Sequence, residues 1–518
     1  MGVNNEAWGS RMGLILAMAG NAVGLGNFLR FPVQAVQNGG GAFIIPYLIC
    51  FLLMGIPLLW IEWSTGRFGG QKGDHSTPFI VQGMDPKRQF WKYIGVFGIF
   101  TNIAVAAYYC YIESWTLAWV YHSLIGTFSG MDQAAVGQFF SDYMVVNQTT
   151  TGIPYENVVF YIICLVLNTW ILSRGLSGGV EIAAKIAMPL LILFGIFLAI
   201  QGVSLTAGDK GALFDGTVGL GFLWEPQFDS LTNPSVWLAA AGQIFFTLSV
   251  GMGTIQCYAS YLRKNRDVAL NAMTAGWMNE FVEVVLGASI LIPICVGYFG
   301  VDKVVELVNS GGGFGLAFQS LPFLFQNWGD ILGILAGVSF FGLLFFAGIT
   351  SSLAMGTPWM GFMQDEFGWK REYAALSFGC IILVLGLPTV FFYNYGVFGE
   401  YDYWAGTVSL VVFAMIESIL FAWVWGIDKG WEELNRGAEM KVPKIYKYIL
   451  KYITPALLLF VFVGSLFSPV GGEWATAFSS LLSGHGWTFD QGSLIGTITN
   501  DALKMQIAAA QGAGDLVT

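Results

Sequence analysis

The feature of this 518-residue sequence that most restricts its fold is a series of eleven long apolar runs. The hydrocarbon core of a bilayer is about 30 Å thick, so a helix needs roughly 20 apolar residues to cross it. Runs of about this length lie near residues 11–36, 41–65, 90–124, 158–174, 180–203, 236–262, 271–300, 328–363, 372–393, 403–427 and 445–468. The sequence therefore predicts an all-α polytopic membrane protein with eleven transmembrane helices.

Composition supports this prediction and excludes other classes. Charged residues make up 11% of the chain and hydrophobic residues 55%, whereas soluble domains carry about 25% charged residues. The net charge of −10 and the absence of a basic stripe argue against nucleic-acid binding. All six cysteines lie inside apolar runs without metal-type spacing, and the three histidines form no HExxH motif. An intramembrane enzyme is therefore disfavoured.

The distribution of basic residues predicts the orientation in the membrane. Nineteen of the 23 lysines and arginines fall on one side of the predicted spans, and this side is normally cytoplasmic. We expect a cell (inner) membrane protein with a cytoplasmic N-terminus and, after eleven spans, an external C-terminus. Residues 1–468 would form the membrane domain. Residues 469–518, whose longest apolar stretch is 474–482, would form an extracellular or flexible tail.

Two predicted spans carry glycine clusters at their midpoints. The clusters lie at 20–27 in the first span and at 247–253 in the sixth, and each interior glycine costs a helix about 1 kcal/mol relative to alanine. Small residues also allow close helix packing, which alone explains most glycine-rich spans. Spans one and six, however, begin two successive sets of five, as in an inverted repeat whose broken helices meet at a central site. We therefore expect a transporter with repeats at about 11–203 and 236–427.

Five glutamates lie deep in predicted spans, where ionisable groups are costly. They are Glu62, Glu113, Glu280, Glu283 and Glu417. A buried glutamate can simply accept hydrogen bonds from the backbone of an unwound helix, which is our interpretation of Glu62, Glu113 and Glu417.

Two patterns allow a cation site. Glu283 follows Asn279 by four residues, so both face one side of a helix and could supply oxygen ligands to a cation. The consecutive hydroxyls at 350–352 could do the same, or could bond to their own helix backbone.

Several long motifs resemble those of the neurotransmitter:sodium symporter family, and most closely its bacterial leucine-transporting members. These motifs are GNAVGLGNFLRFP (20–32), NGGGAF (38–43), YYCYIESW (108–115), GQIFFTLS (242–249), FFAGITSS (345–352) and DYWAGT (402–407). The resemblance covers about residues 1–468. It implies the fold of the leucine transporter, with eleven helices of which the first and sixth are broken.

The resemblance also implies two Na⁺ sites and one substrate site. The first Na⁺ would be held by Ala22, Asn27, Thr247 and Asn279 together with the substrate carboxylate, and the second by Gly20, Val23, Ala347, Thr350 and Ser351. The substrate would contact Ala22, Leu25, Gly26, Val105, Tyr109, Phe246, Thr247, Ser249, Met252, Ser351 and Met355. Glu283 resembles the carboxylate that replaces chloride in bacterial members, so no chloride requirement is expected.

Two gates follow from the same resemblance. Arg30 and Asp402 would pair outside the substrate site, and Trp8, Ser260, Tyr261 and Asp365 would close the inner side. The sequence departs from the family at Asn5, where a basic partner for Asp365 is usual, so the inner salt bridge is in doubt. The twelfth helix of some members is absent.

The sequence therefore predicts sodium-coupled import of neutral hydrophobic L-amino acids. Gly24 is the strongest local argument, because monoamine-transporting relatives place an acidic residue at this position. Carriage of another zwitterion, such as glycine, an osmolyte or a γ-amino acid, is the first alternative, and an ion channel is the second. The resemblance leaves open whether two copies form a homodimer in the lipid.

Overall fold

The computed structural model describes residues 7–144, 153–226, 228–469, 474–487, 489–490 and 493–495, and the regular secondary structure of this part is helical apart from one isolated bridge between Pro469 and Phe489. The first half contains α1 (Arg11–Ala22), α2 (Leu25–Gln37), α3 (Gly41–Cys50), α4 (Ile56–Gly70), α5 (Thr77–Met84), α6 (Phe90–Leu124), α7 (Gln133–Met144), α8 (Tyr155–Ser173), α9 (Glu181–Val203) and α10 (Gly216–Trp224). The second half contains α11 (Pro234–Leu248), α12 (Thr254–Ser260), α13 (Val268–Glu280), α14 (Ala288–Phe299), α15 (Val301–Phe314), α16 (Leu321–Gln326), α17 (Asp330–Phe367), α18 (Arg371–Phe391), α19 (Val397–Tyr403), α20 (Leu410–Ile419), α21 (Ile427–Asn435), α22 (Ile445–Tyr448), α23 (Thr454–Leu466) and α24 (Trp474–Leu482). Short π-helical turns join several of these helices end to end.

Nine helices of the described chain are long and apolar enough to cross a membrane, and the bent pair α1 and α2 makes a tenth span. The protein is therefore a multi-pass membrane protein. The sixth predicted span, 236–262, is the one not counted, because it is divided between α11 and α12, of which neither reaches this length. The number eleven consequently stays a prediction. The nine-residue α24 is too short to cross.

The two predicted helix breaks are confirmed. The first span bends by 46° between α1 and α2, where Val23 and Gly24 leave the helical conformation. The side chain of Asn27 accepts a hydrogen bond from the Gly24 N–H at 2.8 Å and so caps the start of α2. In the other broken span, Ser249, Gly251 and Gly253 all have positive φ. Glycine adopts this region at no steric cost, so the glycine pattern explains where the helix stops.

The second break is held by a buried carboxylate. Glu62 on α4 accepts a hydrogen bond from the N–H of Gly251 at 2.6 Å, which confirms the backbone-binding role expected for this residue. Glu113 instead accepts from the side-chain amide of Asn168 at 3.0 Å, so the expectation of a backbone partner was wrong there. Within the described chain, neither carboxylate oxygen of Glu417 has a hydrogen-bond partner.

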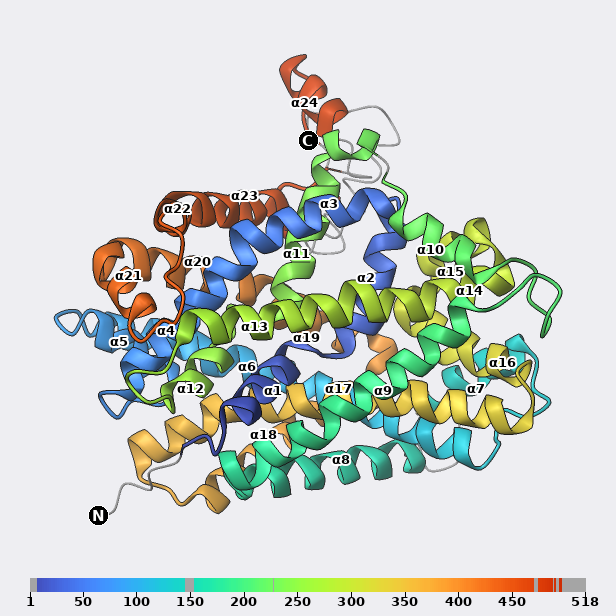
Figure 1. Ribbon diagram of the computed structural model, residues 1–518, viewed down its shortest axis with the longest axis horizontal. Helices are drawn as coiled ribbons and strands as arrows, with labels where there is room; N and C mark the ends of the chain where they lie inside the picture. The colour runs from blue at the N-terminus through green and yellow to red at the C-terminus, as the bar shows by residue number, and fades with distance from the viewer. Residues whose placement is uncertain are drawn as a thin grey trace.

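The broken helices lie inside the bundle. Helix α1 packs against α9, α13 and α17, while α11 packs against α2 and α3, and α12 against α4 and α17. Figure 1 shows α5, α12 and α21 at one end of the molecule and α7, α10, α15 and α16 at the other. Irregular backbone at membrane depth is tolerated only inside the protein or against a cavity, and these packing contacts place both breaks inside the bundle.

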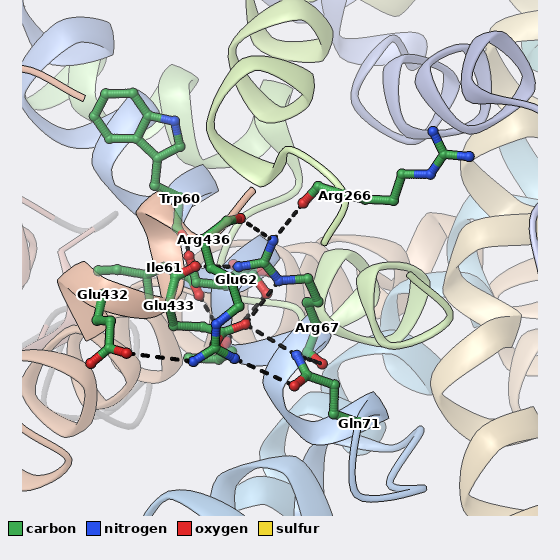
Figure 2. A network of polar contacts seen from close by, with 11 residues as sticks. Trp60, Ile61, Glu62, Arg67, Gln71, Arg266, Glu432, Glu433 and Arg436 are labelled. Atoms are coloured by element: carbon green, nitrogen blue, oxygen red, sulfur yellow. Dashed lines mark hydrogen bonds and ion pairs between the residues drawn. The ribbon is translucent and has the colours of Figure 1, made fainter. Parts of the chain in front are cut away.

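A buried ion pair joins α4 to α21 near the N-terminal end of the molecule. The Nε atom of Arg67 lies 2.8 Å from Oε1 of Glu433, and both side chains are almost fully buried. Arg67 also donates to the backbone oxygens of Arg266 and Arg436, while the side chain of Arg436 contacts the second oxygen of Glu433 at 2.6 Å (Figure 2). Because every charge in this network has several partners, its burial is compensated, and the network fixes α21 to the bundle.

Candidate functional site

A small cavity lies where the two helix breaks meet. It is lined by Ala22, Gly24, Gly26, Asn27, Val105, Tyr109, Phe246, Thr247, Ser249, Met252, Ser351, Met355, Gly406 and Leu410. These residues come from both broken helices, α6, α17, the π-helical turn Trp404–Ser409 and the start of α20. Ten of the eleven predicted substrate contacts are among them, and Leu25 faces a neighbouring cavity instead. The sequence prediction missed Gly406 and Leu410. Gly406 lies inside the quoted DYWAGT motif, so a signal for it was present.

The cavity combines an apolar lining with uncharged polar groups. Val105, Phe246, Met252 and Met355 supply the apolar surface, and no lining side chain is acidic. The backbone N–H of Leu25 donates to the hydroxyl oxygen of Tyr109 at 3.0 Å. The open volume is about 30 Å³, enough for roughly one or two water molecules. A larger molecule therefore fits only if flexible side chains of the lining rotate.

Gly24 stands at the point of closest approach in this lining. A Cβ atom at this position would lie 2.7 Å from the hydroxyl of Tyr109 and 3.0 Å from that of Ser351. The site consequently has no room for the acidic side chain considered at this position in the sequence analysis.

A cluster of polar side chains lies beside the cavity. The amide nitrogen of Asn27 donates to Oδ1 of Asn279 at 2.8 Å, to Oε2 of Glu283 at 3.0 Å and to the Thr247 hydroxyl at 3.2 Å. The Thr247 hydroxyl donates to Glu283, and the side chain of Gln243 donates to the other oxygen of Glu283 at 2.6 Å. All of these groups are buried. The structure thus brings together three of the four residues predicted for the first Na⁺, and places Ala22 in the adjoining cavity wall.

Most of the residues predicted for the second Na⁺ lie where α1 meets α17. The hydroxyl of Ser351 donates to the backbone oxygen of Gly20 at 3.2 Å, and a Cβ atom at Gly20 would lie 2.9 Å from Cβ of Thr350. The hydroxyl of Thr350 bonds to its own helix, 2.9 Å from the oxygen of Phe346 and 3.2 Å from that of Ala347. Of the two interpretations left open for these hydroxyls, Thr350 therefore shows back-bonding and Ser351 a contact across to α1. Val23, the other predicted ligand on this segment, lies one residue beyond the end of α1.

Phe246 lines both the small cavity and a wider vestibule of about 260 Å³. Its ring lies 4.4 Å from the guanidinium carbon of Arg30, in a cation–π contact. Asp402 accepts a hydrogen bond from the hydroxyl of Tyr108 at 2.7 Å. Arg30 and Asp402 both line the vestibule, but no ion pair joins them among the described residues. The expected Arg30–Asp402 pair is replaced here by these two separate contacts.

The opposite side of the site is closed by aromatic and polar contacts. The indole N–H of Trp8 donates to the backbone oxygen of Tyr258 at 3.0 Å. The ring of His75 stacks on Tyr261 at 4.2 Å and its Nδ1 lies 2.9 Å from the Ser260 hydroxyl. Asp365 accepts from the backbone N–H of His75 at 2.8 Å.

The structure therefore brings three of the four predicted inner-gate residues into contact with His75, which the sequence analysis missed. The fourth, Trp8, lines a neighbouring cavity together with Tyr261. Burial lowers the pKa of His75 to about 4, so its ring is neutral near pH 7. Asn5 lies outside the described residues.

The chain was compared with known proteins. The model of the sodium:neurotransmitter symporter family matches residues 5–134 and 131–497. An uncharacterized sodium-dependent transporter of Methanocaldococcus jannaschii is 31% identical over 462 residues, covering 88% of this chain and 89% of the relative. Sodium-dependent nutrient amino acid transporter 1 of Drosophila simulans is 25% identical over 518 residues, covering 89% of this chain and 77% of the relative.

A solved structure resembles the whole bundle. The crystal structure of MhsT in complex with L-phenylalanine matches with a TM-score of 0.75 and 29% identity, covering 88% of this chain and 99% of that chain. The all-helical fold and the two helix breaks agree with this likeness. The family match spans most of the chain, so the resemblance noted from the motifs is confirmed. The protein is a sodium-dependent transporter, not an enzyme, and belongs to the sodium:neurotransmitter symporter family.

Proposed function

We propose that this protein imports neutral hydrophobic L-amino acids by sodium-coupled alternating access. The observation that carries the proposal is the small cavity between the two helix breaks, whose lining combines apolar side chains with uncharged polar groups. The positive end of α2 and the Tyr109 hydroxyl lie together at this cavity and suit a carboxylate. With no acidic group in the lining, the substrate amine would rest on backbone carbonyls and hydroxyls.

The apolar half of the lining favours a hydrophobic side chain. Val105, Phe246, Met252 and Met355 offer it no hydrogen-bond partner, and burying polar groups without partners is costly. Methionine side chains adapt to different shapes because they have three rotatable bonds. This lining supports aliphatic and aromatic amino acids over glycine, a betaine-like osmolyte or a γ-amino acid. The phenylalanine in the MhsT complex agrees with this choice.

We further propose two Na⁺ sites. The first would use the side-chain oxygens of Asn27, Thr247 and Asn279, which lie in one buried cluster. The backbone oxygen of Ala22 would complete it. The second would use the carbonyl end of α1 with Ser351 and Thr350. Oxygen ligands of this kind suit hard cations. Both ions travel with the substrate, so they are cargo of the transport cycle.

Chloride should not be needed, because Glu283 already supplies a negative charge beside the first proposed Na⁺ site. Its two oxygens accept hydrogen bonds from Asn27 and Gln243, which holds the carboxylate in place. Uptake measured with chloride replaced by gluconate should be unchanged, and a dependence on chloride would contradict this role of Glu283.

The decisive experiment is uptake of radiolabelled L-leucine and L-phenylalanine into proteoliposomes, with an inward sodium gradient or with potassium in its place. Sodium-dependent accumulation that is competed by hydrophobic amino acids supports the proposal. Competition by glycine, betaine or γ-aminobutyrate alone would favour a different zwitterion. Single-channel currents without accumulation would indicate an ion channel.

A further inference from the structure

The nine-residue helix α24 has one apolar face and one polar face. Trp474, Phe478, Leu481 and Leu482 recur at the spacing of a single helix face, and we call these four residues the apolar stripe. The side chains of Phe478, Leu481 and Leu482 are 52%, 51% and 88% exposed. The other face carries small polar residues that are also exposed, namely Thr476, Ser479 and Ser483. No residue of 474–484 is charged.

Aromatic contacts hold α24 at the end of α23. The ring of Trp487 lies 5.8 Å from that of Trp474 and 5.0 Å from that of Phe478. The indole N–H of Trp487 donates to the backbone oxygen of Phe467 at 3.0 Å, and Phe467 directly follows α23. The segment after α24 therefore returns to the point at which α23 ends and fixes α24 there.

The exposed side of α23 leads to the same point. Helix α23 belongs to the apolar span Ile445–Leu466, and its side chains Leu459, Phe460 and Val463 are 53%, 47% and 41% exposed. In a multi-pass membrane protein these side chains face lipid. Phe467, which is 40% exposed, extends this lipid-facing surface to the residue that Trp487 contacts. The lipid-facing surface of α23 and the apolar stripe of α24 are therefore joined through Phe467 and Trp487.

We propose that α24 lies in the membrane–water interface at the end of α23, with its apolar stripe in the lipid and its serine face in water. Figure 1 shows α24 clear of the bundle, and the described chain leaves most of the stripe uncovered. Tryptophan is enriched at membrane interfaces, and amphipathic helices bury their apolar face there. A second copy of the chain could cover the same stripe, but the continuity with the lipid-facing surface of α23 favours lipid.

The absence of charge in 474–484 defines the kind of lipid contact. Basic amphipathic helices depend on anionic lipids, because their lysines and arginines are attracted to the negative membrane surface. Helix α24 has no such residue, so its contact depends on apolar side chains alone. We therefore expect the same binding to zwitterionic and to anionic membranes.

Electron paramagnetic resonance of the full-length protein in nanodiscs, one copy per disc, tests this position. A nitroxide is attached to Leu481→Cys or Leu482→Cys, and to Thr476→Cys or Ser483→Cys as controls on the polar face. The exposed Cys380 is replaced by serine in all of them. Oxygen, which concentrates in lipid, should relax the labels at 481 and 482 more strongly than a water-soluble nickel chelate does. The order should be reversed at 476 and 483.

A charge on either face provides a matched pair of variants. The label at 481 should lie about 5–10 Å below the lipid headgroups, the depth typical of interfacial helices. Leu482→Glu places a carboxylate in the apolar stripe and should bring this label to the water. Ser483→Glu places the same charge one residue further, on the polar face, and should leave the depth at 481 unchanged.

Three results would overturn the proposal. The first is a nickel chelate that reaches 481 and 483 equally, which would place the whole helix in water. The second is insertion that requires phosphatidylglycerol and is absent in phosphatidylcholine alone. The third is spin–spin broadening at 481 in discs that hold two copies, together with exposure to water in discs that hold one, which would assign the stripe to a second copy. Should Leu482→Glu fail to fold, the labels at 481 and 483 decide alone, and none of these readouts involves the proposed substrate.

Discussion

At the scale of single residues, Gly24 lies so close to Tyr109 and Ser351 that a side chain at this position would disturb the proposed substrate site. Gly24→Asp places a carboxylate against Tyr109 and Ser351, where it would compete with the carboxylate of an amino acid. We expect sodium-dependent leucine uptake to fall to background. Gly242→Ala in α11 is the control, because a Cβ atom there meets nothing within 4 Å. Leucine uptake by the Gly24→Asp protein equal to that of the control would contradict the proposed position of the substrate.

Met252 should set the size of the accepted side chain. The residue is 3% exposed, and its backbone oxygen is held by the side chain of Asn102 at 2.5 Å, so its side chain can rotate while its backbone stays in place. Met252→Phe fills the cavity with a rigid ring, so tryptophan and phenylalanine should compete less well with leucine. One excess methylene in an apolar pocket lowers discrimination-relevant binding by roughly 10- to 200-fold, and we expect a loss of this size. Competition assays with the labelled leucine measure this shift. Equal competition by tryptophan before and after the change would show that Met252 does not set size.

His75 should make the inner side sensitive to acid. Burial lowers its pKa to about 4, whereas an exposed histidine titrates near 6.5. Above pH 6.5 the ring is neutral and its burial is undisturbed. As the pH falls from 6.5 toward 4, protonation favours the state in which the inner side is open and the ring is exposed. At pH 5.5 the ratio of open to closed protein should rise by about tenfold. The groups that face the ring are Tyr261 and Ser260, and Asp365 binds its backbone.

Accessibility of a cysteine introduced behind Trp8 measures this opening. His75→Gln removes the titrating group, so the acid-induced increase should disappear in this variant. A His75→Gln protein that still opens on acidification would assign the effect to another carboxylate or histidine.

At the scale of secondary-structure elements, the break between α11 and α12 depends on a side chain of α4. Glu62→Ala leaves the N–H of Gly251 buried without a partner, which costs about 1–3 kcal/mol. We expect a lower thermal transition of the purified protein and weaker sodium-dependent uptake. Glu62→Gln retains an oxygen acceptor and should lie close to the unmodified protein. If Glu62→Ala were as stable as Glu62→Gln, the backbone of the break would not depend on this bond.

At the scale of the whole molecule, two Na⁺ and a zwitterionic amino acid would carry two positive charges inward. Each charge gains about 2.3 kcal/mol per 100 mV, so two supply about 4.6 kcal/mol, enough for more than a thousandfold accumulation. An inside-negative potential, set by potassium and valinomycin, should therefore accelerate uptake into proteoliposomes. Uptake that ignores the potential would contradict the transport of two uncompensated Na⁺.

The sequence by itself determined the membrane class, the family and the position of both helix breaks. These properties depend on local chemistry: the length of an apolar run against the thickness of a bilayer, and the low helix propensity of glycine at 20–26 and 251–253. The motif resemblance also identified ten of the residues that line the central cavity. It identified them because the motifs themselves span the breaks.

Only the tertiary structure decided which distant groups meet. Glu62 reaches Gly251 across 189 positions, Glu181 reaches Ser10 across 171, and His75 enters the inner gate from a loop that carries no motif. Arg30 lies over the ring of Phe246 and does not pair with Asp402. Opposite charge in the sequence was therefore not enough to predict which group Arg30 contacts in the vestibule. Such pairings depend on how the helices pack in three dimensions, and no local pattern of residues encodes them.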